Sequence, residues 1–491
     1  MINLTLTQAL CKLKSREISA TELTRAHLDR IEKLNPELNA YITVTADRAM
    51  ADAVAADARY DAGNALPLDG IPIGMKDLFA TRDIRTTAGS RMLENFVPQY
   101  ESTVSQNLIN TGTVLLGKTN MDEFAMSGTG RTSFFGPSVN PYSRDVKLMP
   151  GGSSSGSVAA VSAGMCMAAT GSDTGDSIRF PSSLTGLVGI KPTYGLCSRY
   201  GCFAYASSLD HPGSIARTVD DAAALLAGMA GYDVHDSTSY PGADSVVDAL
   251  KGGIHSAPIR GLRIGIIREI ANAPGIDDDM QKTFMKYIHD MTAAGAEIVE
   301  ISIPHIMHTA TLYGIISRAE AASNLARYDG MRYGLRVEGD DLIDTYMKTR
   351  AAGFGENVKF RMLTGAITQT KEFYDPLFVH AAKVRYLLTH EFDMAMEKCD
   401  VILTPSAPGA AIALDADLGD DAARISNAML VPMNMTGMPG CSVPAAHNES
   451  GLPLGLHVAG AFGDDVRVLA VAKCIEEMAN LDNRPTIVMG R

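Results

Sequence analysis

Two serines in glycine-rich turns are the residues of this sequence best suited to chemistry. Ser153 lies in the run Gly-Gly-Ser-Ser-Ser-Gly-Ser at 151–157, and Ser177 lies in Gly-Ser-Asp-Thr-Gly-Asp-Ser-Ile-Arg at 171–179. Glycine lets backbone N–H groups approach a ligand closely, and a serine hydroxyl can act as a nucleophile. The segment between the two serines is long enough for one helix and one strand, which would bring them back together.

A glycine- and serine-rich run can also be a flexible linker or a phosphate-binding loop. The segment 158–171 carries no charged residue and should be buried, whereas linkers are not flanked by buried elements. The run also lacks the Gly-Lys-Ser/Thr ending of a phosphate-binding P-loop. We therefore interpret 151–179 as the centre of a site.

A serine nucleophile needs a base, and Lys76 is the candidate. None of the eleven histidines lies in a recognised serine-hydrolase context, and His211 is expected in a Pro/Gly turn. Lys76 ends a buried strand predicted over 68–75, and burial can lower a lysine pKa enough for the amine to act as a base. A lysine at a strand end is more often an exposed charge, so this assignment depends on the combination with two serines.

The elements that must position these residues alternate between strands and helices. This alternation predicts an α/β fold with a mixed, largely parallel central sheet covered by helices on both faces. Because no linker is visible, we expect a helical segment over 1–65 to pack on one catalytic domain over 66–491. The more detailed expectations are a helix ending near Asn35-Pro36, another over 45–60, a surface insert over 233–260, a mostly helical stretch over 309–398, and strands near 114–117, 263–268, 297–303, 401–404, 441–444 and 454–459.

Composition and charge exclude several other classes of protein. The chain has 491 residues with 43 basic and 56 acidic side chains, a net charge of −13, and no Lys/Arg-rich block that would bind nucleic acid directly. No apolar run is long enough to span a membrane, and the N-terminus becomes polar too early for a secretion signal. The seven cysteines form no CxxC pair, which indicates reduced thiols without a metal site. We expect a cytoplasmic protein.

Taken together, the motifs resemble those of the amidase-signature hydrolases. Within that family they are most similar to the ammonia-releasing subunits of the tRNA-dependent amidotransferases. Each run is weak alone, but jointly they cover nearly the whole chain. The matching runs are GIPIGMKD at 70–77, NMDEFAM at 120–126, GGSS at 151–154, GSDTG-x-SIR-x-P at 171–181, GLVGIKPTYG at 186–195, SRYG at 198–201 with ASSLD at 206–210, and VPMNMTGMPG at 431–440.

The resemblance implies roles for the residues singled out above. Ser177 would be the nucleophile that forms an acyl-enzyme, and Lys76 would be the general base acting on it through Ser153. Ser153 would be held by a non-proline cis peptide, a rare bond that costs about 3–4 kcal/mol. The backbone N–H groups of Thr174, Gly175, Asp176 and Ser177 would form the oxyanion hole.

The resemblance also implies a substrate and three residues that bind it. Glutamine would be hydrolysed, with its carboxylate on Arg361, its ammonium at Asn427 and its pocket lined by Tyr313. A helix-surface pair is the alternative for Arg361 and Tyr313. No cofactor or metal is expected on this chain. The motifs leave open whether glutamine or asparagine is the donor.

Partner chains are a further implication of the resemblance. A second subunit, called B in these amidotransferases, would hold the tRNA and use ATP and Mg²⁺ to convert Glu-tRNA(Gln) or Asp-tRNA(Asn). A small third one, called C, would complete a heterotrimer. The acidic net charge of this chain agrees with leaving the tRNA to a partner.

Several residues depart from the family pattern. Ser155 and Asp176 stand where glycine is usual, Phe180 with 182–184 replaces a Gln-Pro-Ala-Ala run, and Asn427 replaces an acid. A carboxylate near a forming oxyanion is repulsive, and the loss of one oxyanion donor typically costs about 10²–10³ in rate. Two alternatives to an active glutaminase therefore stay open: a stand-alone amidase acting on another amide, and a weakened chain kept as a scaffold for its partners.

Overall fold

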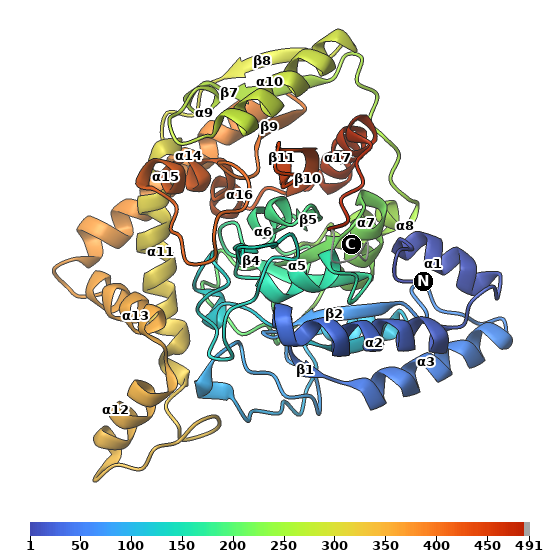
Figure 1. Cartoon of the computed structure of the whole chain (residues 1–491). Helices are drawn as coiled ribbons and strands as arrows, with labels where there is room; N and C mark the ends of the chain where they lie inside the picture. Colours follow the sequence, from blue (N-terminus) through green and yellow to red (C-terminus); the bar gives the residue numbers. More distant parts are fainter. Residues whose placement is uncertain (486–491) are drawn as a thin grey trace.

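The computed structural model describes residues 1–485. Within these residues, eleven strands form one mixed sheet (Figure 1). Across the sheet the strands follow the order β1-β3-β2-β4-β6-β5-β10-β11-β9-β7-β8. Their bounds are β1 (Tyr41–Val44), β2 (Pro72–Lys76), β3 (Val114–Thr119), β4 (Ala168–Asp173), β5 (Val188–Lys191), β6 (His211–Ala216), β7 (Arg263–Ile267), β8 (Glu297–Ile301), β9 (Val401–Pro405), β10 (Gly440–His447) and β11 (Pro453–Ala459).

Most of the helices pack around this sheet, whereas the two helices over 342–353 and 356–368 project away from it (Figure 1). Their bounds are α1 (Leu6–Lys14), α2 (Ala20–Leu38), α3 (Ala46–Asp61), α4 (Thr103–Asn110), α5 (Ser155–Ser162), α6 (Arg179–Leu184), α7 (Val219–Met229), α8 (Ala243–Lys251), α9 (Arg268–Ala271), α10 (Asp278–Ala293), α11 (Thr309–Asn324), α12 (Leu342–Gly353), α13 (Glu356–Thr368), α14 (His380–Met396), α15 (Asp420–Leu430), α16 (Pro432–Thr436) and α17 (Asp465–Ala479). The predicted α/β class with a mixed central sheet is confirmed.

The sheet has two parallel parts on either side of an antiparallel centre, and its edge strand β1 pairs antiparallel with β3. Strand β2 pairs in parallel with β3 and β4, and β7 pairs in parallel with β8 and β9. The pairings β4–β6, β6–β5, β5–β10, β10–β11 and β11–β9 are all antiparallel. The expectation of a largely parallel sheet is therefore wrong for the centre. Strands β10 and β11, for example, are joined by a short turn, which only an antiparallel pair allows.

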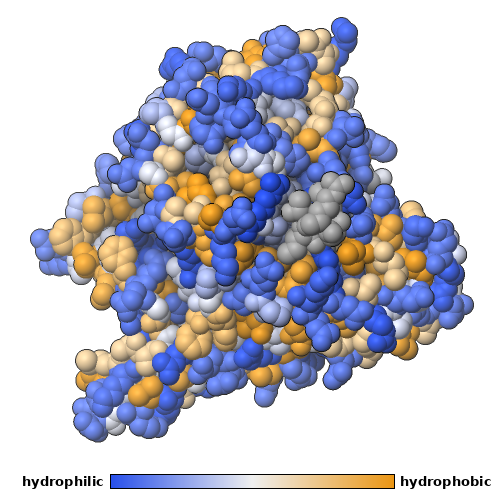
Figure 2. Space-filling view, viewed as in Figure 1, coloured by the Kyte–Doolittle hydropathy of each residue, from blue (hydrophilic) through white to orange (hydrophobic). Residues whose placement is uncertain are grey.

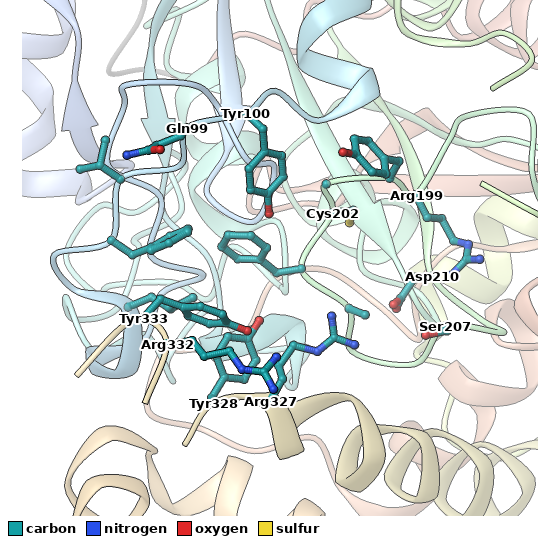
Figure 3. A pocket seen from close by; sticks show the side chains of 17 residues that line it. Gln99, Tyr100, Arg199, Cys202, Ser207, Asp210, Arg327, Tyr328, Arg332 and Tyr333 are labelled. Carbon is teal, nitrogen blue, oxygen red and sulfur yellow. The ribbon is translucent and has the colours of Figure 1, made fainter. Parts of the chain in front are cut away.

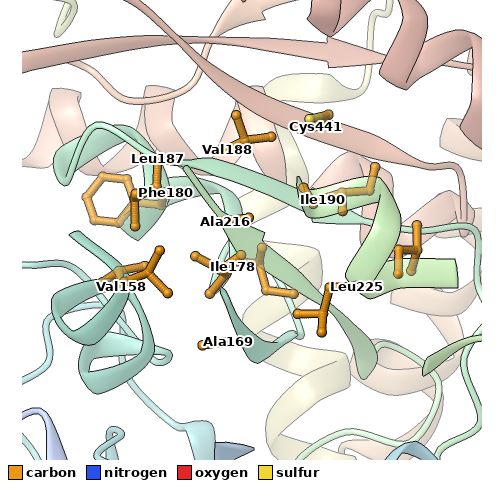
Figure 4. Packing of buried hydrophobic residues seen from close by; sticks show 14 of the residues in the cluster. Val158, Ala169, Ile178, Phe180, Leu187, Val188, Ile190, Ala216, Leu225 and Cys441 are labelled. Carbon is orange, nitrogen blue, oxygen red and sulfur yellow. The ribbon is translucent and has the colours of Figure 1, made fainter. Parts of the chain in front are cut away.

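The elements that carry the two serine turns are locked into the hydrophobic core. Every residue of α5 and β4 is buried, which confirms the expected burial of the uncharged segment between the serines. Figure 4 shows Val158 of α5 together with Ile178 and Phe180, facing apolar side chains of β5 and β6. Because close-packed cores have few voids, turns anchored in this way have little freedom to move.

Helix α2 does not end at Asn35-Pro36 as expected but continues to Leu38. Proline removes one backbone donor, yet it lies in the last turn here, and Leu34 and Leu38 are both buried in the core. Asn39 then ends the helix in the left-handed conformation, with φ of 47°. Burial of the apolar face outweighs the proline signal.

Two further expectations from the sequence differ from the structure. His211 is the first residue of strand β6 rather than part of a turn, because the Pro-Gly pair after it lies within the β4–β6 ladder. The stretch 233–260 contains helix α8, whose buried Ala243, Val246 and Leu250 face the core and which packs against α7. Its polar residues are only the outer side of an amphipathic helix.

The first 65 residues supply helices α1, α2 and α3, and also strand β1, which pairs with β3 at one edge of the sheet. The division of the chain into a segment over 1–65 and a domain over 66–491 stays a prediction. Among the described residues, no helix combines the length and apolar character needed to cross a membrane. All seven cysteines are free thiols.

Candidate active site

Lys76, the last residue of β2, is fully buried and surrounded by hydroxyl groups. Its Nζ lies 2.8 Å from Oγ of Ser153, 2.9 Å from Oγ of Ser154 and 2.8 Å from Oγ of Ser172. The carbonyl oxygen of Ser172 is a further acceptor at 3.3 Å. The amine therefore contacts Ser153 directly, as a base that acts through this serine would need to do.

Burial lowers the pKa of Lys76 from its ordinary value to about 7. An ammonium group is costly in a low-dielectric interior, and here hydroxyls rather than a carboxylate stand next to it. The charges of Asp122, Asp173 and Asp210 act in the opposite direction, which keeps the pKa near neutrality. A lysine with this pKa is about half neutral at pH 7 and can accept a proton.

The two serine turns meet, as the sequence predicts. Helix α5 leads away from the first turn and β4 returns to the second, where the backbone N–H of Ser154 donates to the carbonyl of Ser177 at 3.3 Å. The Gly152–Ser153 peptide is cis, as the resemblance implies. Gly152 admits no side chain, because a Cβ there would lie 2.0 Å from Oδ2 of Asp122.

Ser177 has a hydroxyl that is free to meet a ligand. Its side chain is only 4 % exposed, and its Oγ makes no hydrogen bond to any of the residues 1–485. The Ser153–Ser177 hydrogen bond of a proton relay is thus not formed in this structure. The backbone N–H groups of Thr174, Gly175, Asp176 and Ser177 also have no acceptor among the described residues. Four adjacent unpaired donors beside a serine are suited to bind a developing oxyanion.

A buried ion pair holds the second turn in place. The guanidinium of Arg179 donates to both carboxylate oxygens of Asp173 at 3.0 Å and to the carbonyl of Gly175 at 2.9 Å. It also reaches the carbonyl of Leu430 and Oδ1 of Asn434, both at 2.8 Å. Burial alone would raise the pKa of Asp173, but the adjacent guanidinium holds it below its ordinary value. Bidentate pairing of this kind fixes geometry as well as charge.

The NMDEFAM run braces the first turn. Asp122 donates its backbone N–H to the carbonyl of Ser153 at 3.2 Å. Its carboxylate accepts from the N–H of Gly130 at 2.8 Å, and from the N–H and hydroxyl of Thr132 at 2.9 and 2.8 Å. Through these hydrogen bonds, Asp122 holds the loop over 127–132 against Ser153.

Tyr313 packs on the loop of Ser177 and Arg361 contacts Tyr205, so neither stands on an open helix surface. A Cβ added to Gly175 would lie 3.1 Å from the ring of Tyr313, so this ring packs on the loop. Arg361 donates to the phenol oxygen of Tyr205 at 2.6 Å, and that oxygen lies 3.0 Å from Oγ of Ser317. Tyr205 was missed by sequence reasoning, although it lies between two motif runs.

Asn427 is not brought to these residues by any side-chain hydrogen bond among the described residues. Its amide donates to the carbonyl of Ala423, one turn earlier in α15, at 2.7 Å.

Asp176 is half-buried beside Ser177. Burial and the charge of Asp173 raise the pKa of Asp176 to about 7.

The remaining departures from the family pattern lie away from Lys76. Oγ of Ser155 is 3.3 Å from Oγ of Ser138, on the side of the first turn that faces the 130–138 loop. The hydroxyls of Ser182 and Ser183 are buried and have no partner among residues 1–485. Unpaired buried hydroxyls cost stability rather than reactivity.

A cavity of about 790 Å³ lies next to the site, and Figure 3 shows the side chains that line it. Arg327 and Arg332 lie on one side with Tyr328 and Tyr333. Asp210 lines the cavity and also accepts from the hydroxyl of Thr174 at 2.8 Å, so the cavity reaches the loop before Ser177. Within residues 1–485, no group of His, Cys, Asp or Glu side chains is arranged to hold a metal ion.

Known proteins are similar to this chain in both sequence and fold. The sequence profile of the family named Amidase matches residues 22–469. The chain belongs to the amidase family. The A subunit of the glutamyl-tRNA(Gln) amidotransferase of Rhizobium meliloti is 48 % identical to this amidase-family chain over 98 % of both chains. The protein of the same name from Gluconobacter oxydans is 47 % identical over 99 % of this chain and 98 % of its own length.

Solved amidase-family structures superpose on nearly the whole chain. The A subunit of the glutamyl-tRNA(Gln) amidotransferase of Thermotoga maritima is 32 % identical with a TM-score of 0.78, covering 99 % of this chain and 97 % of its own. The peptide amidase of Stenotrophomonas maltophilia is 28 % identical with a TM-score of 0.85, covering 98 % of both chains. The resemblance first seen in the motifs is confirmed.

Proposed function

We propose that this chain is the glutaminase subunit of a Glu-tRNA(Gln) amidotransferase, which releases ammonia from glutamine for the amidation of Glu-tRNA(Gln). The observation that carries the proposal is the buried contact between Lys76 and Ser153, beside the loop of Ser177. Two proteins named as A subunits of this amidotransferase are 48 % and 47 % identical to this chain over nearly its whole length, which supports the choice of reaction.

The reaction follows from the arrangement of these groups. Neutral Lys76 takes the proton of Ser153 as Ser153 takes the proton of Ser177, whose oxygen then attacks the amide carbon of glutamine. The N–H groups of residues 174–177 stabilise the oxyanion. Collapse of the intermediate breaks the C–N bond, and the proton returns through Ser153 to the leaving ammonia. Water then cleaves the acyl-enzyme by the same route and releases glutamate.

Residues near Ser177 are proposed to provide the substrate contacts. Arg361 carries a half-buried positive charge that suits the carboxylate of an amino acid, and Tyr313 packs against Gly175. Asn427, half-buried on α15, offers only a neutral amide, and its amide nitrogen already donates to the carbonyl of Ala423.

The chain is proposed to work in the cytoplasm, in a heterotrimer with a tRNA-binding subunit and a small subunit. The tRNA-binding subunit would hold the tRNA and use ATP and Mg²⁺. The net charge of −13 on this chain agrees with leaving the tRNA to that partner. Figure 2 shows apolar side chains exposed over α12 and α13, a surface that suits contact with another protein chain. The exposed residues are Leu342, Ile343, Met347, Phe360, Leu363 and Ile367.

The test is ammonia release from glutamine by the chain co-purified with these two partners. Ser177→Ala should abolish ammonia release while the complex still forms, and Ser155→Gly, on the far side of the first turn, should retain it. A wild-type complex that cannot use glutamine would contradict the proposal. Rapid hydrolysis of unrelated amides by the isolated chain would instead favour a stand-alone amidase. Activity that returns only with Asp176→Gly would favour a scaffold role.

A further inference from the structure

Asp176 is an acid in the site that has no partner. It directly precedes Ser177, its side chain is half-buried, and its carboxylate accepts no hydrogen bond from any described residue. No Lys, Arg or His nitrogen of residues 1–485 lies within the 4.0 Å of an ion pair with it. A half-buried carboxylate without a partner in the described chain is available to pair with a cationic group of a ligand.

The other acids near this position are already used by the fold. Asp122 accepts backbone N–H groups of the 127–132 loop, and Asp173 is paired with Arg179. Asp210 accepts from the hydroxyl of Thr174 and from the backbone N–H of Tyr205 at 3.0 Å. Asp176 is therefore the carboxylate of this neighbourhood that remains available to a ligand.

Arg361 is close enough to Asp176 for its opposite charge to act on this carboxylate. The charge of Arg361 lowers the pKa of Asp176, and both charges act on the pKa of Tyr313. Arg361 and Asp176 nevertheless form no ion pair. Nη1 of Arg361 donates to Tyr205 and Nε to Asn357 at 3.3 Å, which leaves Nη2 without a hydrogen bond inside the described chain. A separated cation and anion beside a nucleophile match a zwitterionic amino acid.

We propose that Asp176 binds the α-ammonium group of the glutamine substrate whose α-carboxylate is assigned above to Arg361. This inference rests on the proposed glutaminase function. The amide carbon of glutamine is joined to the α-carbon by two methylene groups. An ammonium held at residue 176 therefore lets the amide reach the neighbouring Ser177. Asp176 is in this view a specificity residue rather than damage to the oxyanion hole.

The charge balance of the site supports this role. The proximity of Asp173 and Asp122 disfavours a negative charge on Asp176, whereas Arg179 and Arg361 favour it. Burial, the largest effect, and these charges together raise the pKa of Asp176 to about 7 in the empty site. An incoming ammonium would pair with the carboxylate and favour its ionised form. The paired acid then carries no net repulsion for the oxyanion that forms later at Ser177.

The test compares two substrates in the complex with the tRNA-binding and small subunits. Glutamine carries the α-ammonium, whereas 5-amino-5-oxopentanoate has the same amide and carboxylate without it. In Asp176→Asn, the preference for glutamine over the analogue, measured as the ratio of kcat/KM values, should fall about 10- to 100-fold, the range expected for a charge-assisted hydrogen bond. Asp176→Glu, which keeps the charge, should restore part of the preference.

A binding measurement keeps the inference testable if Asp176→Asn also slows the chemistry. In the Ser177→Ala background, titration calorimetry should show weaker glutamine binding when Asp176→Asn is added, and an unchanged affinity for the analogue. An equal loss for both ligands would overturn the inference and leave the glutaminase function intact. A wild-type complex that fails to hydrolyse glutamine at all would instead overturn the proposed function.

Discussion

Lys76 and Lys118 are both fully buried and lie on adjacent parallel strands, yet they are surrounded by different groups. In the register of β2 and β3, Lys118 stands opposite Met75, the residue before Lys76. Nζ of Lys76 contacts three serine hydroxyls. Nζ of Lys118 also contacts two hydroxyls, those of Thr86 at 2.8 Å and Thr81 at 3.2 Å, but it donates to the carbonyl of Phe79 at 2.6 Å and lies 3.8 Å from a carboxylate oxygen of Asp77 as well.

The difference teaches which buried lysines can act as bases. Burial lowers the pKa of both, to about 7 for Lys76 and about 8 for Lys118, and the charge of Asp77 opposes the effect for Lys118. A serine hydroxyl can pass a proton on, whereas a carbonyl or a carboxylate that pairs with an ammonium holds the charge in place. We therefore expect Lys76 to serve chemistry and Lys118 to serve the fold.

The largest expected effect is that of Lys76→Met on activity. Removing the base should lower kcat for glutamine hydrolysis by about 10²–10⁴-fold, because Ser153 would have nothing to take its proton. Ammonia release by the purified complex measures this loss, and thermal unfolding of the variant serves as the control for folding. Retention of wild-type kcat would show that another group is the base.

Lys118→Met should act on stability instead. It leaves Asp77 buried without its cation, and breaking a buried pair in this way costs about 3–5 kcal/mol. Urea unfolding of the full chain measures the change in the free energy of unfolding. Because Asp77→Asn removes the stranded charge, the double variant should recover much of the loss. If Lys118→Met folded normally but lost its activity, the contrast between the two lysines would be wrong.

The pH profile of kcat should also distinguish the two lysines. Below the pKa of the base, kcat should change by about tenfold per pH unit, which is a smaller effect than the loss of the base itself. Only neutral Lys76 can accept a proton, so kcat should rise with pH up to about 7 and then level off. Lys118 is not in the path, and Lys118→Thr or another variant that folds should keep this midpoint. Asp176 titrates in the same range, so the profile is repeated in Asp176→Asn, where the rise in kcat should persist. A kcat independent of pH between 5 and 8 would argue against a lysine base.

Ser154→Ala should give the smallest effect. It removes one acceptor that stabilises the ammonium form of Lys76, which should move the midpoint of the kcat profile to lower pH. The ammonium form of Lys76 should lose about 0.5–1.5 kcal/mol of stabilisation, which corresponds to about two- to tenfold in rate. Thr81→Val, which removes a hydroxyl 3.2 Å from Nζ of Lys118, is the matched control and should change stability without moving the midpoint. Identical profiles for Ser154→Ala and wild type would show that this hydroxyl does not tune the base.

The parts of the site that lie close along the chain could be predicted from the sequence. The uncharged segment after Ser153 and the spacing to Ser177 predict that the two turns meet, and a strand end before the turns predicts the place of Lys76. The same reasoning could not predict the contact of Asn434 with Arg179, which spans 255 residues, although Asn434 lies in the motif run at 431–440. It also could not show that Asp176 lacks a partner, because this depends on how the fold uses the surrounding acids.

The fold was predictable at the level of class but not of strand direction. Alternating apolar segments indicate strands and helices, but they do not say which strands become neighbours. The antiparallel centre arises from pairings such as β5 with β10, which are distant in sequence. Helix α2 likewise continues past Pro36 because Leu38 finds a place in the core, a gain that local propensity does not contain.

The contacts of Arg179 have a consequence for the order in which the protein is made. Leu430 and Asn434 follow Arg179 by 251 and 255 residues, and both are needed to saturate its guanidinium. On the ribosome, the loop of Ser177 emerges long before these partners, and contacts of such sequence separation form late. A nascent or truncated chain that stops before residue 430 therefore lacks the groups that hold the loop. Ammonia release is in this way tied to completion of the polypeptide.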